Sequence, residues 1–326
     1  MARNIRRRIL EAAIIVFITG VLLVLGAEVL LRLFFPQVVM FPRWEASPAY
    51  GVALPRGATM VHARPGKWEF RYSINEDGCR GARLPAASDK SKPLIVTLGD
   101  SYTMGMGVND GEEYPAILAR ALGNNFRVMN CGSPGWGLTQ EVRRFHEFAL
   151  HHEPDVVILQ FCANDPEDGQ RDAVTRFVND GFVFQDTARR YNPVFAALSN
   201  YRFVQSSQLY AFIRGWYEIR RDAQVAHADT TNTVEQEYVS LLGAFARDLD
   251  RRKIPLIMIS VNGQLDNFPV IRAGIETLDQ NGLLEYIEVK DWFRGKANFE
   301  SPEGHEWGAE AHAIIGRELA RYVKQL

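Results

Sequence analysis

Residues 93–107 read PLIVTLGDSYTMGMG and decide the fold class of the chain. Leu94 to Leu98 form a short, continuous apolar run with β-branched residues, which is typical of a strand buried on both faces of a sheet. The run ends at Gly99 in a polar turn that carries Asp100 and Ser101. Open α/β folds bind ligands at the carboxyl edge of the sheet, where this turn would present the Ser101 hydroxyl. Equally, Ser101 could be the capping residue of an ordinary strand-to-helix turn.

Two further strand–turn–helix units follow this stretch. Short apolar runs at Phe126–Asn130 and Val156–Phe161 predict strands, and polar turns follow them at 131–137 (CGSPGWG) and 162–165 (CAND). Helices are expected from Tyr114 to Leu122 and from Thr139, as the cap, to about residue 152. Three such units in succession predict an α/β fold, a three-layer α/β/α sandwich around a parallel, flavodoxin-like sheet. In the 2-1-3 strand order of such sheets, the Ser101 strand lies in the middle.

The same alternation resumes in the C-terminal third of the chain. Periodicity predicts helices at 232–252, 270–280 and 309–323, and strands at 256–260 and 284–289. We therefore expect one large α/β domain over residues 93–326. An insert at about 166–231 interrupts it and contains a predicted hairpin at 177–184 with an Asp180-Gly181 turn. The insert is rich in aromatic residues, and we interpret it as a helical cap with a small core of its own, the alternative being a lid or substrate platform.

Composition narrows the classes of partner. The chain has 326 residues, 47% of them hydrophobic and 23% charged, as in globular proteins. Its formal net charge is −2, and it has no long basic run outside the N-terminus, so we expect no nucleic-acid partner. The three cysteines lack metal-ligand spacing. In the 2-1-3 order Cys131 and Cys162 lie two strand spacings apart, about 9.6 Å, beyond the ~7 Å limit for a disulfide.

The N-terminus has a different character. Four arginines, at positions 3, 6, 7 and 8, precede an apolar stretch, and no charge lies between Glu11 and Glu28. As a helix this uncharged part spans roughly 24 Å, and flanking apolar residues extend it toward the ~30 Å bilayer core. We expect residues 1–35 to be a cytoplasmic tip and transmembrane anchor, with the rest of the chain extracytoplasmic. A cleaved signal peptide and a buried soluble helix are the alternatives.

Residues 36–92 separate this helix from the predicted sheet. They are rich in Pro, Gly and aromatic residues up to about residue 67, without clear periodicity. This composition favours a linker that packs loosely on the domain. The alternation at Trp68–Ile74 predicts an edge strand.

A nucleophilic serine needs a base, a group that orients the base, and donors for the developing oxyanion. Among seven histidines, His305 lies in a loop that enters the last helix and is the candidate base, whereas His312 lies inside that helix. The donor candidates are the Ser101 N–H, the Gly135 N–H and the Asn164 side-chain amide. All of them follow neighbouring strands and would converge at one sheet edge.

At this point the chain resembles the SGNH or GDSL-type serine hydrolases, whose four sequence blocks it matches in order. The matching segments are Gly99-Asp100-Ser101, Asn130 to Gly135, Ala163-Asn164-Asp165 and Glu303-Gly304-His305. The resemblance implies Ser101 as nucleophile, His305 as base, and Ser101, Gly135 and Asn164 as the oxyanion hole. The turn at Asn75 to Gly81 and the single predicted membrane anchor also resemble those of membrane-tethered members of the family.

The last block departs from the family pattern, which usually has aspartate two or three residues before the histidine. Here Pro302 and Glu303 occupy these positions, so Glu303 becomes the candidate acid. In an extended segment, residues two apart project to the same side. Glu303 and His305 would then reach one cleft, whereas Glu306 would project away. Asp291 and Glu300 could reach it only if the loop folds back.

Together these features predict a membrane-anchored serine esterase that forms an acyl-enzyme and uses no metal or organic cofactor. The resemblance and the extracytoplasmic placement suggest acyl-ester substrates, with O-acetyl groups on carbohydrate or envelope polymers foremost. An O-acyltransferase with the same site, a catalytically dead module that binds glycan or a partner, and a lipase-like or thioesterase role are the alternatives.

Overall fold

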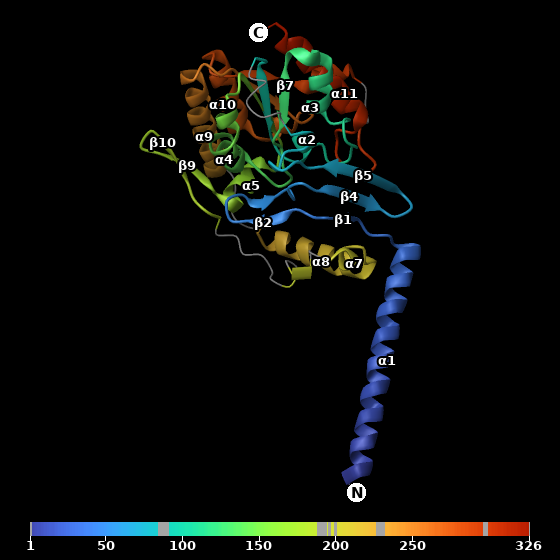
Figure 1. Ribbon diagram of the computed structural model, residues 1–326. Coiled ribbons are helices and arrows are strands. Elements are labelled where there is room, and N and C mark those ends of the chain that lie inside the picture. Colours follow the sequence, from blue (N-terminus) through green and yellow to red (C-terminus); the bar gives the residue numbers. More distant parts are fainter. Residues whose placement is uncertain are drawn as a thin grey trace. The chain divides into compact units, whose positions relative to one another are not determined.

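The computed structural model describes residues 2–83, 91–187, 194, 197–198, 201–225, 232–295 and 299–325. The chain forms two compact units (Figure 1). The first unit consists of residues 1–41, 61–69 and 193–228, and the second of residues 42–60, 70–192 and 229–326.

A five-stranded parallel sheet is the centre of the second unit. Its order is β12-β11-β8-β6-β7, built from β6 (Leu94–Leu98), β7 (Arg127–Asn130), β8 (Val156–Phe161), β11 (Leu256–Ser260) and β12 (Glu285–Ile287). The predicted 2-1-3 order is confirmed, because β6 lies between β7 and β8. Thr97 pairs with Asn130 on one side and with Ile158 on the other. The turns that follow these three strands therefore meet at one edge of the sheet.

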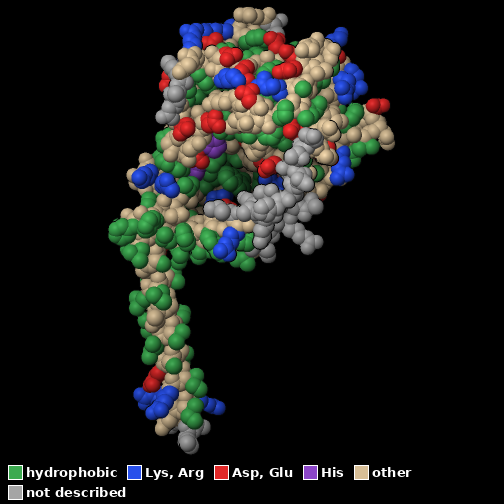
Figure 2. All heavy atoms as spheres, turned by 180° about the vertical axis from the view of Figure 1, so that it is seen from behind, with side chains coloured by type: hydrophobic (Ala, Val, Ile, Leu, Met, Phe, Trp, Pro, Cys, Tyr) green, Lys and Arg blue, Asp and Glu red, His purple; other side chains and the backbone are tan. Residues whose placement is uncertain are grey.

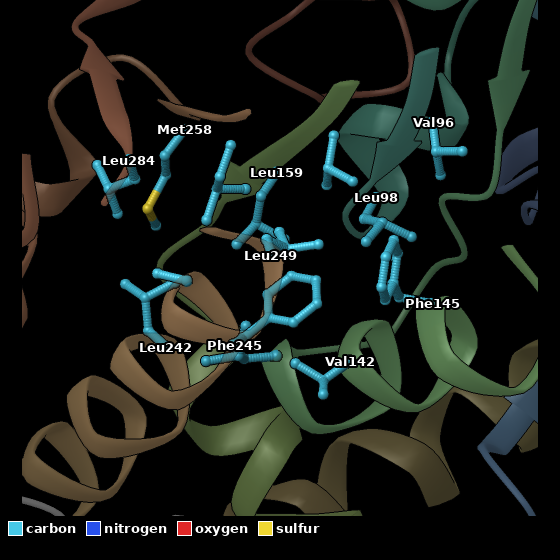
Figure 3. Close-up of a cluster of buried hydrophobic side chains, with 14 of the residues drawn as sticks. Val96, Leu98, Val142, Phe145, Leu159, Leu242, Phe245, Leu249, Met258 and Leu284 are labelled. Atoms are coloured by element: carbon cyan, nitrogen blue, oxygen red, sulfur yellow. The ribbon is translucent and has the colours of Figure 1, made fainter. Parts of the chain in front are cut away.

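Helices cover both faces of this sheet. One face packs against α3 (Tyr114–Leu122) and α11 (Ala309–Val323), and the other against α4 (Leu138–Glu147), α9 (Asn232–Arg251) and α10 (Pro269–Gln280). Side chains of β6 alternate between the two cores, as a strand requires: Leu94, Val96 and Leu98 join one, and Ile95 joins the other. Figure 3 shows the first core, where Phe145 and Phe245 lie between the helices and the sheet. The predicted three-layer sandwich is confirmed.

Shorter elements complete the second unit. They are a two-stranded sheet of β2 (Glu45–Ser47) and β3 (Gly51–Ala53), helices α2 (Ser101–Met104) and α5 (Asp165–Asp172), the hairpin of β9 (Thr175–Val178) and β10 (Gly181–Phe184), and 3₁₀ helices η2 (Gly123–Asn125), η3 (Ala149–His152), η4 (Gln264–Asn267) and η5 (Val289–Phe293). The hairpin turn lies one residue earlier than predicted. Gly181 pairs with Val178, so Asn179 and Asp180 form the turn, with φ of 50° and 61°.

The first unit contains a long helix, α1 (Ala2–Phe34), together with β1 (Val39–Phe41), α7 (Arg202–Gln205) and α8 (Gln208–Val225). Strand β1 pairs antiparallel with β4 (Thr59–Arg64), and β5 (Trp68–Ser73) is the third strand of that sheet. Helix α1 packs against α8. Its segment Asn4–Phe34 has a mean hydropathy of 2.7 in its most apolar window, none of which is buried. By length and composition it is a candidate membrane span or signal sequence.

Several sequence-based expectations were wrong in detail. The loosely packed linker at 36–67 instead contains β1 to β4, in which Met40, Val52 and Met60 are buried. The expected helix at 139–152 begins at Leu138 and ends at Glu147, with η3 after it, and the strand at 284–289 is shorter.

The described residues of the insert at 166–231 pack in two separate places and not around one core of their own. In its described part, Phe177 and Phe182 of the hairpin pack on the core of the sheet, whereas α8 packs against α1. Several aromatic residues of the insert are exposed, among them Phe203, Phe212 and Trp216. Phe195 and residues 226–231 lie outside the described residues. The domain boundaries at residues 35 and 92 stay predictions.

Candidate active site

The turn after β6 presents Ser101 as the first residue of α2. Gly99 is required here, because a Cβ at this position would lie 2.3 Å from the Oγ1 of Thr103. Asp100 is the N-cap of α2, and its Oδ1 accepts a hydrogen bond from the Tyr102 N–H at 2.9 Å. The Ser101 hydroxyl therefore lies at the carboxyl edge of the sheet, as the sequence predicts.

Three polar side chains form a continuous series at this edge. The Oγ of Ser101 lies 3.0 Å from Nε2 of His305, and Nδ1 of the same ring contacts a carboxylate oxygen of Glu303. A carboxylate only accepts hydrogen bonds, so Nδ1 carries the proton and Nε2 is free to accept one from the serine hydroxyl. The ring of Tyr102 packs edge-on against His305, with the ring centroids 4.9 Å apart.

A closed turn brings Glu303 and His305 together, not the extended segment that the sequence suggests. The Ser301 N–H donates to the His305 carbonyl at 2.8 Å, and the Ser301 hydroxyl accepts from the Glu303 N–H at 3.3 Å. Gly107 packs against this turn, and a Cβ there would lie 2.4 Å from the Ser301 Oγ. The sequence predicted that Glu303 and His305 lie close together. The hydrogen-bonded turn, and not an extended segment, brings them together.

The other acid candidates lie elsewhere. Glu306 accepts a hydrogen bond from the Gln264 side chain at 2.7 Å, and Asp291 and Glu300 are exposed. Among the interactions of His305 that the structure describes, Glu303 is the carboxylate partner.

The two remaining donor candidates share a network of charged side chains. The Nδ2 of Asn164 donates to Asp168 at 2.8 Å. Arg171 contacts Asp168 and donates to the Gly135 carbonyl at 3.0 Å. The loop after β7 and the start of α5 are thus tied together, with Gly135 at a φ of 74°.

Burial dominates the titration of the two acids in this network. It raises the pKa of Asp100, against the opposing effects of the Tyr102 N–H, His305 and Asn164. It also raises the pKa of Asp168, which Arg171 and the Asn164 amide oppose. These donors favour the charged form of each carboxylate, whereas burial favours the neutral form.

Sequence reasoning missed Arg80 and Tyr72, which hold the loop after Ser101. The guanidinium of Arg80 is fully buried and donates to the carbonyls of Met104 and Val108, both at 2.9 Å. It lies 4.7 Å from the centroid of the Tyr72 ring, whose hydroxyl accepts from the Gly107 N–H at 3.0 Å. Nothing in the local sequence around Arg80 signals this role, because the acceptors are backbone groups at least 24 residues away.

Gln160 was also missed, although the sequence carries a signal for it. It is the one polar residue in the apolar strand Val156–Phe161, and its Oε1 accepts from the N–H and the hydroxyl of Thr103, at 3.2 and 3.0 Å. Most buried side-chain polar atoms are hydrogen-bonded, so a polar contact of Gln160 close to its strand could have been inferred.

Cys79, Cys131 and Cys162 are buried and free in the structure. The strand order that separates Cys131 from Cys162 is confirmed, and the absence of a link between them in an oxidising compartment stays a prediction. The sulfur of Cys131 instead lies 2.7 Å from that of Cys79. Within the described ranges, no group of three or more His, Cys, Asp or Glu side chains is arranged to hold a metal ion.

Comparison with known proteins identifies the class. The model of the GDSL-like Lipase/Acylhydrolase family matches residues 97–261, just over half of the chain. The chain belongs to this family and is a hydrolase that acts on ester bonds. The matched range contains Ser101, Gly135 and Asn164 but ends before Glu303 and His305.

Solved structures resemble the chain at low identity. A putative lipolytic protein of the G-D-S-L family from Desulfitobacterium hafniense has a TM-score of 0.45 and 13% identity, over 71% of this chain and 99% of its own. An acetyl xylan esterase from Butyrivibrio proteoclasticus has a TM-score of 0.40 and 15% identity, over 75% and 65%. Est24, a carbohydrate acetylesterase from Sinorhizobium meliloti, has a TM-score of 0.42 and 11% identity, over 72% and 99%. No curated protein matches the sequence.

Proposed function

We propose that the chain hydrolyses acyl esters through a covalent acyl-enzyme on Ser101, with His305 as general base and Glu303 as the acid that orients it. The observation that carries this proposal is the hydrogen-bonded series from the Ser101 Oγ through His305 to Glu303. A serine hydroxyl is a weak nucleophile, and such a series activates it. Membership in a family of ester hydrolases supports the same reaction.

The steps follow from the positions of the protons. Nε2 of His305 removes the hydroxyl proton as the Ser101 Oγ attacks the ester carbonyl. The ring is then positively charged, and the Glu303 carboxylate stabilises it through Nδ1–H. As the tetrahedral intermediate collapses, Nε2 gives its proton to the leaving alkoxide. Water then attacks the acyl-enzyme with His305 again as base, which releases the acid and restores Ser101.

In this proposal, the oxyanion is held by the Ser101 N–H, the Gly135 N–H and the Asn164 side chain. The loops that carry them follow β6, β7 and β8, which are adjacent in the sheet. Loss of one such donor costs roughly 3 kcal/mol in comparable enzymes. Because Asn164 has two amide hydrogens, it can hold Asp168 with one and face the substrate with the other.

For the substrate, we propose O-acetyl or other acyl esters on carbohydrate or envelope polymers. The support is the candidate membrane span, which would confine the site to the vicinity of a membrane. The arginines at positions 3, 6, 7 and 8 favour a cytoplasmic N-terminus and an extracytoplasmic hydrolase unit. A reporter fused after Leu326 tests this orientation, since it should be active only if it is of the extracytoplasmic type.

A fluorophosphonate probe tests the nucleophile. The probe should label the wild-type chain and the matched control Ser240→Ala, which changes an exposed serine of α9. It should not label Ser101→Ala. Labelling of Ser101→Ala at the wild-type rate would contradict the proposal. Release of free acetate from an acetylated polysaccharide would then identify hydrolysis, whereas acetate found only on an added sugar would identify acyl transfer.

A further inference from the structure

The uncharged stretch of helix α1 ends at Glu28, which contacts the start of α8. The sixteen residues between Glu11 and Glu28 carry no charge, and the large apolar side chains along α1 are exposed. Glu28 then accepts hydrogen bonds from the Ser207 hydroxyl at 2.8 Å and from the backbone N–H groups of Gln208 and Leu209 at 3.0 and 2.9 Å. The first turn of α8 is therefore fixed to α1 at the end of this uncharged stretch.

A second contact strengthens this junction. Arg32, one turn after Glu28, donates to the Glu28 carboxylate at 2.6 Å and to the Ser206 carbonyl at 3.0 Å. Arg32 belongs to α1 and also binds the segment between α7 and α8. These helices therefore form one assembly within the first unit. Figure 1 shows α7 and α8 running across the end of α1 rather than along it.

Helices α7 and α8 expose an apolar surface beside that junction. We call it the aromatic platform, and its exposed fractions are 54% for Tyr201, 77% for Phe203, 48% for Phe212, 48% for Ile213 and 51% for Trp216. In α8, positions 212, 213 and 216 share one helical face. In the space-filling view of Figure 2, hydrophobic side chains gather where the long helix ends.

Arginines border the platform. The guanidinium of Arg220 lies over the Trp216 ring, 4.0 Å from its centroid, and both Arg202 and Arg220 are exposed. A helix with Trp and Phe on one face and arginines beside them is suited to the boundary between acyl chains and headgroups. Tyr and Trp prefer this depth, and arginines there meet anionic lipid phosphates.

We propose that the aromatic platform on α7 and α8 lies in the headgroup region of the bilayer that α1 enters. The occupant is a lipid surface because the platform adjoins the apolar surface of α1 and lies at the end of its uncharged stretch. The platform would keep the first unit at a fixed depth and orientation, which a single helix cannot do. Helix α8 also packs against α1 in the folded chain, which favours an anchor over a signal sequence that is cleaved off. The proposal is independent of the esterase chemistry.

Spin labels on the full-length chain in vesicles of zwitterionic and anionic phospholipid test the proposal. Single cysteines replace Phe203, Phe212 or Trp216, while the native cysteines are buried and stay unlabelled. Collisions with oxygen, which is enriched in lipid, and with a water-soluble nickel chelate are measured. Leu22→Cys in α1 is the lipid reference, and Gln236→Cys on an exposed position of α9 is the water reference.

The expected result is a several-fold higher ratio of oxygen to nickel collisions at all three platform positions than at position 236. Ratios equal to that at 236 would place the platform in water and overturn the proposal. Labels shielded from both reagents would mean that protein covers the platform, a second copy included, and would also overturn it. A water-like ratio at position 22 would mean that α1 does not lie in the bilayer, which would overturn the proposal. Because the platform positions are exposed, the substitutions should preserve the fold, which thermal unfolding of each variant checks.

Discussion

His305 and His312 are seven residues apart, but they lie in two regions of opposite character. The turn Ser301–His305 places the first imidazole between a hydroxyl and a carboxylate at the edge of the sheet. Helix α11 buries the second completely, where its Nδ1 accepts a hydrogen bond from the Tyr114 N–H at 3.1 Å. Burial lowers the pKa of His312 to about 3, so this ring stays neutral. The same side chain is thus a candidate base in one region and a packing residue in the other.

The hydrogen-bond partners that a histidine can reach, and not the residue type alone, decide what it can do. His305 has a proton donor on one nitrogen and an acceptor on the other, which a base in this mechanism needs. His312 has a backbone donor on Nδ1 and packs against the rings of Tyr114 and Trp307. Because the ring is fully buried, the free-energy cost of charging it is high.

The largest effect should come from removing the candidate base. We expect His305→Ala to lower kcat/KM for a soluble acyl ester by roughly 10⁵-fold, because the serine loses its proton acceptor. Steady-state kinetics of the purified variant measures this, and its thermal midpoint should stay close to that of the wild type. If His305→Ala keeps more than a tenth of the activity while His312→Gln loses it in a folded protein, the two regions have been assigned the wrong roles.

Removing the charge of the orienting acid should have the next largest effect. In Glu303→Gln the amide can no longer stabilise the charged imidazole, and it can hold the ring in the wrong tautomer, so turnover should fall by about 10⁴-fold. Asp291→Asn and Glu300→Gln are matched controls on exposed carboxylates, and their turnover should stay within about twofold of wild type. A large loss in either control, with Glu303→Gln near wild type, would transfer the role to that residue.

Helix α11 should respond through stability instead of turnover. His312→Phe leaves the buried Tyr114 N–H without an acceptor and should lower the free energy of unfolding by about 1–3 kcal/mol. Activity per folded molecule should be preserved. His312→Gln retains an acceptor and should lose less, as measured by denaturant unfolding. Equal losses in both variants would mean that the hydrogen bond to Tyr114 is not what the imidazole contributes.

The pH dependence of stability should differ between the wild type and His312→Gln. Unfolded histidine binds a proton below its ordinary pKa of 6.5, whereas folded His312 does so only near 3. Stability is therefore lost as the pH falls through this window, at up to about 1.4 kcal/mol per pH unit from this group. Groups common to both proteins cancel in the comparison, so His312→Gln should show a shallower decline. Identical slopes from pH 6.5 to 4 would contradict the neutral, buried imidazole.

A smaller effect should come from the network behind the oxyanion donors. Asp168→Asn keeps the size of the side chain but weakens its contacts with Arg171 and Asn164, so kcat should fall by about tenfold with KM unchanged. Glu167→Gln, at an exposed neighbouring position of α5, should leave both constants unchanged. A change in KM alone would mean that Asp168 acts on substrate binding and not on the position of the donors.

The parallel sheet could be predicted from the sequence because each of its strands is a local, continuous run of apolar residues. The runs at 94–98, 156–161 and 256–260 appear as strands with these bounds, and Ser101 follows the first of them. The turn that joins Glu303 to His305 could not be inferred in the same way, since it depends on hydrogen bonds of Ser301 and on the close approach of Gly107. The residues that contact α8 could not be predicted from the sequence for a similar reason. Its contacts with Glu28 bridge about 180 residues, and no periodicity encodes a contact at that distance.

The buried guanidinium of Arg80 has a practical consequence for anyone who wishes to shorten this protein. A chain that begins at the predicted boundary, residue 93, would keep every strand of the parallel sheet and all the residues proposed for the reaction. It would also lose Arg80 and Tyr72, leaving the carbonyls of Met104 and Val108 and the N–H of Gly107 without their partners. A soluble hydrolase cut from this sequence should therefore also keep residues 70–92, in which Arg80 pairs with Asn130 at the edge of the parallel sheet.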